Sequence, residues 1–132
     1  MSRRGASGGG RDYPRTARVN ELLREIIADD LEAIDDERLE LLTITGVEVD
    51  RDLRHAVVFY DSLQGEEGDA VVLEALGSHR VRLQASINRQ ARLRRTPELS
   101  FQPDPGVRSG QRIDELLRGL QRDHRGADER RD

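Results

Sequence analysis

The stretch LELLTITGVEVDRDLRHAVVFYDSL, residues 39–63, decides the fold, because apolar residues recur with a period of two on both sides of a polar turn. In the first half, the phase of this pattern slips by one residue at Gly46. A β-bulge at this glycine would return four apolar residues to one side of the strand: Leu42, Ile44, Val47 and Val49. The second half, His55–Leu63, is rich in β-branched and aromatic residues. Two such strands joined by the short turn DRDLR predict an antiparallel hairpin.

Upstream of the hairpin, the period changes to that of a helix. Between Thr16 and Asp35, apolar residues follow the three-and-four spacing of an amphipathic helix: Val19, Leu22, Leu23, Ile26, Ile27, Leu31 and Ile34. Residues 21–40 carry nine carboxylates against two arginines, so the outer side of this predicted helix is acidic.

Downstream of the hairpin, Asp69 can cap a helical segment that runs from Ala70 to about Leu93. Gly77-Ser78 interrupts its apolar stripe, which predicts two helices or one helix kinked near residues 77–81. After Pro97, the residues ELSF predict a third strand. A last helix then carries four apolar residues: Ile113, Leu116, Leu117 and Leu120.

This order of elements predicts an α+β sandwich, in which helices cover one face of a three-stranded sheet. The chain of 132 residues fits one domain, which we place at residues 14–123. Residues 1–13 are predicted to be a flexible basic tail, and residues 124–132 a flexible polar tail.

Composition excludes several classes of function. The chain has no cysteine, so disulfides and thiolate chemistry are excluded, which suits the cytoplasm. No apolar run approaches the length of a membrane span, and no signal-peptide pattern opens the sequence. All 22 basic residues are arginine. Codon bias explains this best, although the planar guanidinium group also binds phosphate in a two-pronged manner.

Positive charge gathers in the stretch HRVRLQASINRQARLRR, residues 79–95, in a chain whose net charge is −4. It holds six arginines and no carboxylate. On a helix, Arg82, Arg89 and Arg92 share the side opposite Leu83 and Ile87. Arg94 and Arg95 fall at the helix end, where their charge suits the helix dipole, and Arg80 lies nearer the apolar side.

A run of charge is usually a solvated face, but such faces normally mix signs. The absence of carboxylates between Glu74 and Glu98 favours binding of an anionic partner, which would relieve the repulsion. Five N-terminal arginines could reach the same partner: Arg3, Arg4, Arg11, Arg15 and Arg18.

No motif supports catalysis, a cofactor or metal binding. The GxxG match at Gly65–Gly68 precedes the helix pair and contains two glutamates, which repel phosphate. His55, His79 and His124 are far apart and lack metal-ligand spacing. No nucleophile elbow, P-loop or dinucleotide fingerprint occurs. The aromatic residues Tyr13 and Tyr60 could stack on bases, whereas Phe59 and Phe101 fit a core better.

Several segments together resemble the ribosome-binding factor A family of bacterial small-subunit assembly factors. They are Arg18-Val19, Asp36-Glu37-Arg38-Leu39, Thr43, Gly46-Val47-Glu48, Arg51-Asp52-Leu53, Ala56, Val58, Arg92-Leu93-Arg94, Pro97-Glu98-Leu99-Ser100-Phe101 and Arg112-Ile113-Asp114-Glu115-Leu116. The resemblance covers about residues 15–120.

The resemblance implies a type II KH-like fold, which agrees with the order of elements predicted from periodicity. The family usually has proline where this chain has Glu37. It also has an Ala-x-Gly kink between its two central helices, which corresponds here to Ala75-Leu76-Gly77. Counting back from Pro97, however, the kink glycine of the family falls nearer Val81.

For function, the resemblance implies a non-enzymatic protein that binds 16S rRNA of the immature 30S subunit near the platform and neck and assists late maturation, including 5′-end processing. Family members matter most in the cold and leave the mature subunit, in some bacteria with the help of a GTPase assembly factor. The expected protein is a monomer without a cofactor. The expected rRNA-binding residues are Arg80, Arg82, Arg89, Arg92, Arg94, Arg95, Arg15 and Arg18.

Two alternatives stay open. The acidic first helix could make the protein an adaptor that docks a basic ribosomal protein or an enzyme. DNA binding through the last helix is weaker as a hypothesis, because Asp114 and Glu115 lie in its first turns.

Overall fold

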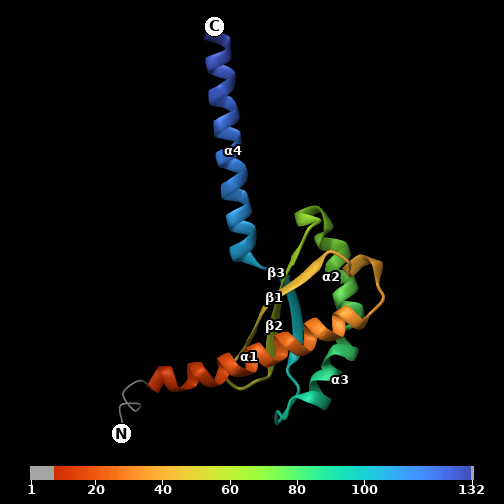
Figure 1. The fold of residues 1–132 in the computed structure, drawn as a ribbon. Helices are drawn as coiled ribbons and strands as arrows, with labels where there is room; N and C mark the ends of the chain where they lie inside the picture. Colours follow the sequence, from red (N-terminus) through yellow and green to blue (C-terminus); the bar gives the residue numbers. More distant parts are fainter. Residues whose placement is uncertain (1–7, 132) are drawn as a thin grey trace.

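The structure is a computed structural model that describes the backbone of residues 8–131 and the side chains of residues 15–120. Within this range the elements follow one another in chain order (Figure 1). They are α1 (Gly8–Ala33), η2 (Glu37–Leu39), β1 (Leu42–Val49), β2 (His55–Ser62), η3 (Gly65–Gly68), α2 (Asp69–Ser78), α3 (Arg80–Gln90), β3 (Glu98–Pro103) and α4 (Pro105–Arg131).

The three strands form a mixed sheet in the order β1-β2-β3. The predicted hairpin is confirmed, because β1 pairs antiparallel with β2, and β3 then adds parallel to β2. The register of the hairpin shifts between Ile44 and Gly46, which is where the sequence predicts a bulge. As a result both Ile44 and Val47 are buried, although strict alternation would put them on opposite faces.

The turn between β1 and β2 is held by the carboxylate of Asp50. Its Oδ1 accepts hydrogen bonds from the backbone N–H groups of Arg54 at 2.8 Å and His55 at 3.2 Å. Leu53 has φ of 58°, in the left-handed region that non-glycine residues rarely adopt. The aspartate therefore offsets the conformational cost of a tight turn.

One face of the sheet carries the core, and α1, α2 and α3 cover this face (Figure 1). Alternate residues of β2 point into it, among them Ala56, Val58 and Tyr60, each with no exposed surface. Leu23 and Ile27 from α1 and Leu83 from α3 are equally buried. The predicted α+β sandwich, with helices on one face of a three-stranded sheet, is confirmed.

Several predicted boundaries differ from the structure. Helix α1 begins at Gly8, before the predicted Thr16, and α4 continues to Arg131. The helical backbone thus continues into both segments predicted as tails, whose flexibility stays a prediction. Residues 1–7 and Asp132 lie outside the described residues. Asp69 does not cap α2, because Gly68 is the N-cap residue and the Asp69 side chain turns elsewhere.

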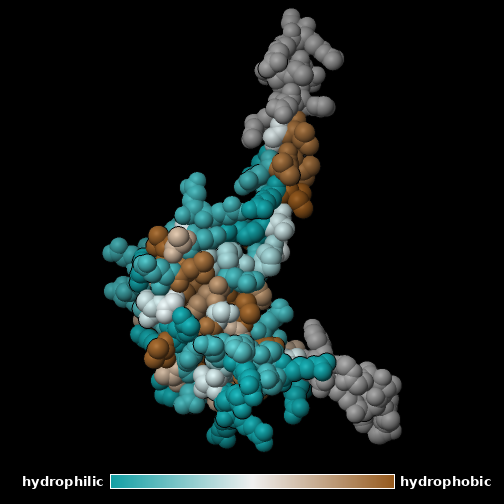
Figure 2. All heavy atoms as spheres, turned by 180° about the vertical axis from the view of Figure 1, so that it is seen from behind, coloured by the Kyte–Doolittle hydropathy of each residue, from teal (hydrophilic) through white to brown (hydrophobic). Residues whose placement is uncertain are grey.

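Helix α4 leaves the end of the sheet and projects away from the domain (Figure 1). Its start is capped by Asp104, whose Oδ1 accepts hydrogen bonds from Gly106 N at 2.9 Å and Val107 N at 3.3 Å. The apolar residues predicted on this helix form an exposed stripe instead of joining the core (Figure 2). Their exposed fractions are 57% for Ile113, 68% for Leu116, 52% for Leu117 and 64% for Leu120.

Candidate nucleic-acid interface

Helix α3 presents two of the predicted arginines on one side. Leu83, Ser86 and Ile87 are buried against the sheet and α1, so the side opposite them faces solvent. Arg82 and Arg89, seven residues apart, both lie on this exposed side. Here the prediction from helical spacing is confirmed.

The prediction that Arg92 belongs to the same helix is wrong. Helix α3 ends at Gln90, and Ala91 has the extended conformation, with φ of −101° and ψ of 133°. From Ala91 to Arg94, burial alternates as it does in a strand, with Ala91 buried and Leu93 partly buried against the core. Arg92 and Arg94 therefore point outward from an extended segment, followed by the exposed Arg95.

We call the six residues Arg80, Arg82, Arg89, Arg92, Arg94 and Arg95 the arginine surface; all six are exposed. Arg80 is the first residue of α3. Arg15 and Arg18 are also exposed, three residues apart on α1. Arg3 and Arg4 lie outside the described residues, and the side chain of Arg11 is not described.

The arginine surface is barely neutralised by its own domain. Arg82 Nε lies 3.8 Å from Asp30 Oδ2 on α1, which is a loose ion pair. Within the described residues, the other five arginines take part in no ion pair. Arg89 only donates a hydrogen bond of 3.3 Å to the hydroxyl of Ser86. The arrangement thus leaves several guanidinium groups free to bind an anion.

Arg82 differs from the rest because its partner is buried. The side chain of Asp30 is 14% exposed, and its Oδ2 atom is buried without a hydrogen-bond partner among the described residues. Arg82 supplies the positive charge nearest to this oxygen. Removing Arg82 would leave a buried carboxylate uncompensated, so this arginine has a structural role as well.

The predicted kink between the central helices lies at His79, which separates α2 from α3 and has φ of −102° and ψ of 4°. Ala75 and Gly77 lie inside α2, before the break. The His79 ring nitrogen Nε2 is 2.8 Å from Asp36 Oδ2, and Arg38 binds the same carboxylate through Nε and Nη2 at 3.0 and 2.8 Å. The helix junction is therefore fixed by residues from the segment before β1.

Asp36 also caps η2 by accepting a hydrogen bond from Arg38 N at 3.0 Å. The side chains of Arg38 and His79, in that order, hold the pKa of Asp36 well below its usual range. In the sequence, Asp36 and Arg38 stand out only as part of the family resemblance. The spacing of Asp36 two residues before Arg38 was the one signal in the sequence that this aspartate could cap η2 and bind the arginine.

Asp36→Asn is expected to lower stability at neutral pH and to flatten its dependence on acid. Because the folded-state pKa is depressed, the contribution of Asp36 is present above its unfolded pKa of about 3.9 and is lost as the pH falls through the folded pKa. The stability difference between wild type and variant should shrink below about pH 5. Urea unfolding at a series of pH values measures this, and a difference that stays constant down to pH 3 would contradict it.

A second polar network, which sequence reasoning missed, anchors α4. Arg108 donates two hydrogen bonds to Asp69, from Nη1 to Oδ2 at 2.7 Å and from Nη2 to Oδ1 at 2.8 Å. The hydroxyl of Tyr60 donates to Asp69 Oδ1 at 2.7 Å. Arg108 lowers the pKa of Asp69, and burial, chiefly, raises the pKa of Tyr60.

Tyr60 and Phe59 take other places than predicted, and the side chain of Tyr13 is not described. Tyr60 is fully buried in the core and cannot stack on a base, whereas Phe59 lies partly exposed on the opposite face of the sheet. Phe101 packs against the core as expected. Among the described side chains, no group of three or more His, Asp or Glu residues could hold a metal ion. No helix in the described part of the chain is long and apolar enough to cross a membrane.

The mixed three-stranded sheet is covered on one face by α1 and a kinked helix pair, and this arrangement defines a KH-like α+β domain. Comparison with known proteins makes the assignment specific. The chain belongs to the ribosome-binding factor A family, because the model of that family, described as Ribosome-binding factor A, matches residues 15–117. The resemblance noted in the sequence is thereby confirmed.

Curated relatives agree with this assignment. Ribosome-binding factor A of Rubrobacter xylanophilus is 43% identical over 105 residues, which is 79% of this chain and 85% of the relative. That of Geobacter metallireducens is 33% identical over 117 residues, which is 88% of this chain and 99% of the relative.

Solved structures agree as well. The crystal structure of ribosome-binding factor A from Thermus thermophilus is similar, with a TM-score of 0.61 and 34% identity over 67% of this chain and 93% of that one. A homology model of the Thermus thermophilus protein, fitted into a cryo-electron microscopy map of its complex with the 30S subunit, has a TM-score of 0.53 and 35% identity. It covers 63% of this chain and 88% of the Thermus chain.

Proposed function

We propose that this protein is a non-enzymatic assembly factor that binds 16S rRNA of the immature 30S subunit through the arginine surface. Late maturation of that rRNA, including processing of its 5′ end, would be assisted by holding one rRNA conformation. Membership of the ribosome-binding factor A family and the 30S complex of the Thermus relative support the partner. One observation carries the binding site: six exposed arginines share a single loose ion pair within the described residues.

The mechanism follows from charge and rigidity. Arg82 and Arg89 are fixed by a helix, and Arg92, Arg94 and Arg95 follow it on a segment held at Ala91 and Pro97, which are both buried. Exposed guanidinium groups that have no carboxylate partner can bind phosphates without first breaking an ion pair. Release would follow when the mature contacts of the rRNA compete for the same phosphates. A GTPase assembly factor and ribosomal proteins are further candidate partners.

Sedimentation with purified small subunits tests this function. We expect the protein to co-sediment with immature subunits more strongly than with mature ones, and with either more strongly than with duplex DNA. If four to six phosphates are bound, the logarithm of affinity should fall with the logarithm of salt concentration with a slope of about −3 to −5. Equal sedimentation with immature subunits at low and high salt would contradict binding through the arginine surface.

A further inference from the structure

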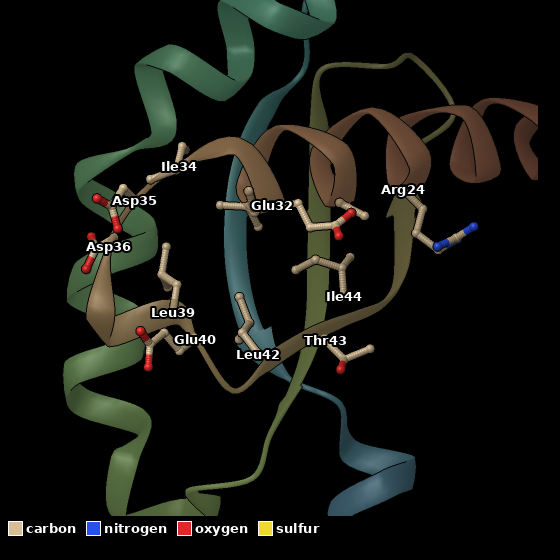
Figure 3. A pocket seen from close by; sticks show the side chains of 12 residues that line it. Arg24, Glu32, Ile34, Asp35, Asp36, Leu39, Glu40, Leu42, Thr43 and Ile44 are labelled. Atoms are coloured by element: carbon tan, nitrogen blue, oxygen red, sulfur yellow. The ribbon is translucent and has the colours of Figure 1, made fainter.

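A pocket of about 510 Å³ lies between the second half of α1, η2 and the start of β1. Its lining is apolar in the middle, with side chains from all three elements: Ala28, Leu31, Ile34, Leu39, Leu42 and Ile44. Four carboxylates also line it: Glu32, Asp35, Asp36 and Glu40. Figure 3 shows Glu32 on α1 and Glu40 after η2 on opposite sides of Leu39, Leu42 and Ile44. We call this site the acidic pocket.

Most of the carboxylates of the acidic pocket are available to a partner. Asp36 is bound by Arg38 and His79. Glu32, Asp35 and Glu40 are exposed and take part in no ion pair among the described residues. The one cationic residue in the lining, Arg24, is already paired with Glu21 at 2.5 Å. The pocket therefore has an excess negative charge that repels nucleic acid and attracts a cation.

The acidic pocket also lies at an open edge of the sheet. Strand β1 is an outer strand, and its far end is covered because Val49 N donates a hydrogen bond of 2.9 Å to the side chain of Asn20. On the other outer strand, Leu99 N is covered in the same way by Gln84, at 3.0 Å. Outer strands left uncovered are able to pair with another chain.

The start of β1 has no such cover. Leu63 N donates across the hairpin to Leu41 O at 3.1 Å, so alternation turns the backbone polar groups of Leu42 and Ile44 toward the open edge. Within the described residues, no hydrogen bond from a third element reaches these groups. The free backbone groups of Leu42 and Ile44 therefore lie beside the carboxylates of the acidic pocket.

We propose that the acidic pocket binds an extended basic segment of another polypeptide, in which every second residue faces the pocket, with aliphatic residues in the middle and a cationic residue at each end. Its backbone pairs with Leu42 and Ile44 as an added strand, while its aliphatic side chains fill the apolar middle of the pocket. Its cationic side chains contact Glu32, Asp35 and Glu40. This partner site goes beyond the proposed rRNA-binding function, since it is formed by α1, η2 and β1 instead of α3 and has the opposite charge.

Titration of the full-length protein with synthetic octapeptides tests the proposal. The alternating basic peptide RSVSVSRS, which places two arginines and two valines on one face of a strand, is compared with the acidic peptide ESVSVSES and with the block peptide RRVVSSSS. We expect only the alternating basic peptide to bind with saturation and to shift the backbone amide NMR signals of Leu42 and Ile44. Equal binding of the block peptide would overturn strand addition, because that peptide has the same charge without the alternation.

Variants locate the site. Replacing Glu32, Asp35 and Glu40 by lysine is expected to weaken the alternating basic peptide at least about 10-fold, from three lost charge contacts and added repulsion. The matched control replaces Glu25, Asp29 and Glu48, which are exposed but do not line the pocket. If the control variant loses affinity for the peptide to the same extent, net charge explains the loss and the proposal is overturned. Replacing Glu32, Asp35 and Glu40 by the corresponding amides should lower the affinity for the peptide less than the lysine variant does.

Two further outcomes would assign the pocket to another occupant. Reversible dimerisation in sedimentation velocity, abolished by the lysine variant, would mean that a second copy of this chain occupies the edge. Loss of rRNA binding in the lysine variant, with unchanged peptide binding, would assign the pocket to RNA. Co-sedimentation with the small subunit, which tests the arginine surface, is measured without the peptide. Failure of the peptide proposal is therefore distinguishable from failure of the rRNA-binding proposal.

Discussion

Replacing Arg89, Arg92, Arg94 and Arg95 by glutamate is expected to weaken association with the immature small subunit by at least about 100-fold at moderate salt. Each exposed guanidinium group that binds a phosphate contributes a charge-assisted hydrogen bond and releases counterions. Four lost contacts together with four new repulsions account for this factor. In the corresponding glutamine variant, the slope of the logarithm of affinity against the logarithm of salt concentration should become less steep by about 3.

The variant leaves out Arg82 for a structural reason. Arg82 is the residue near the buried Oδ2 atom of Asp30, so its reversal would place two carboxylates together and lower the stability of the fold. A loss of binding would then be ambiguous. The other four arginines form no ion pair within the described residues, so thermal unfolding of the quadruple variant should match that of the wild type.

A matched control reverses four exposed arginines elsewhere, namely Arg51, Arg54, Arg112 and Arg118. It changes the net charge equally, and its exposed ion pairs, Arg54–Asp52 and Arg112–Glu66, add little to stability. Affinity for the subunit should fall far less in this control than in the test variant. If both lose affinity to the same extent, net charge and not the arginine surface governs association.

Asp69→Asn is expected to reduce the free energy of unfolding by about 2–3 kcal/mol. The Asp69 carboxylate accepts from Arg108 twice and from the hydroxyl of Tyr60, and both partners are shielded from water, with Tyr60 fully buried and the Arg108 side chain 11% exposed. Without the negative charge, the guanidinium group loses its counter-charge at a site that is largely shielded from water. Urea unfolding followed by circular dichroism measures the change.

A double-mutant cycle with Arg108→Met separates the pair from its surroundings. We expect the double variant to be more stable than the sum of the two single losses predicts, because neither charge is then left uncompensated. The exposed pair Arg112–Glu66 joins α4 to η3 and is the control, with an expected change below about 1 kcal/mol. A loss at Asp69 no larger than in this control would show that the network is not needed for stability.

Much of the fold could be predicted from local patterns. The apolar period of two on both sides of Asp50–Arg54 predicts the hairpin. The slip of this period at Gly46 predicts the bulge, because only a bulge keeps both Ile44 and Val47 on the buried face of the strand. The helix boundaries were less accurate. Nothing in the composition of residues 91–93 ends a helix, and the structure ends α3 there because Ala91 and Leu93 pack in an extended segment.

The candidate site was predicted in part. Exposure of all six arginines follows from their charge, since a guanidinium group is rarely buried without a partner. The partners of Asp36 and Asp69 could not be predicted, because His79 is 43 residues from Asp36 in the chain and Arg108 is 39 residues from Asp69. Contacts at that separation depend on how the helices pack.

By itself, the sequence determined the family, the order of the elements, the bulge at Gly46 and the concentration of arginine before β3, because each is a pattern among near neighbours in the chain. Only the tertiary structure decided that Arg82 compensates Asp30, that Tyr60 and not Phe59 lies in the core, and that an acidic pocket opens beside β1. These depend on which surfaces the packing of α1, α3 and the sheet buries and which it leaves to water, and burial sets how strongly a charge needs a partner.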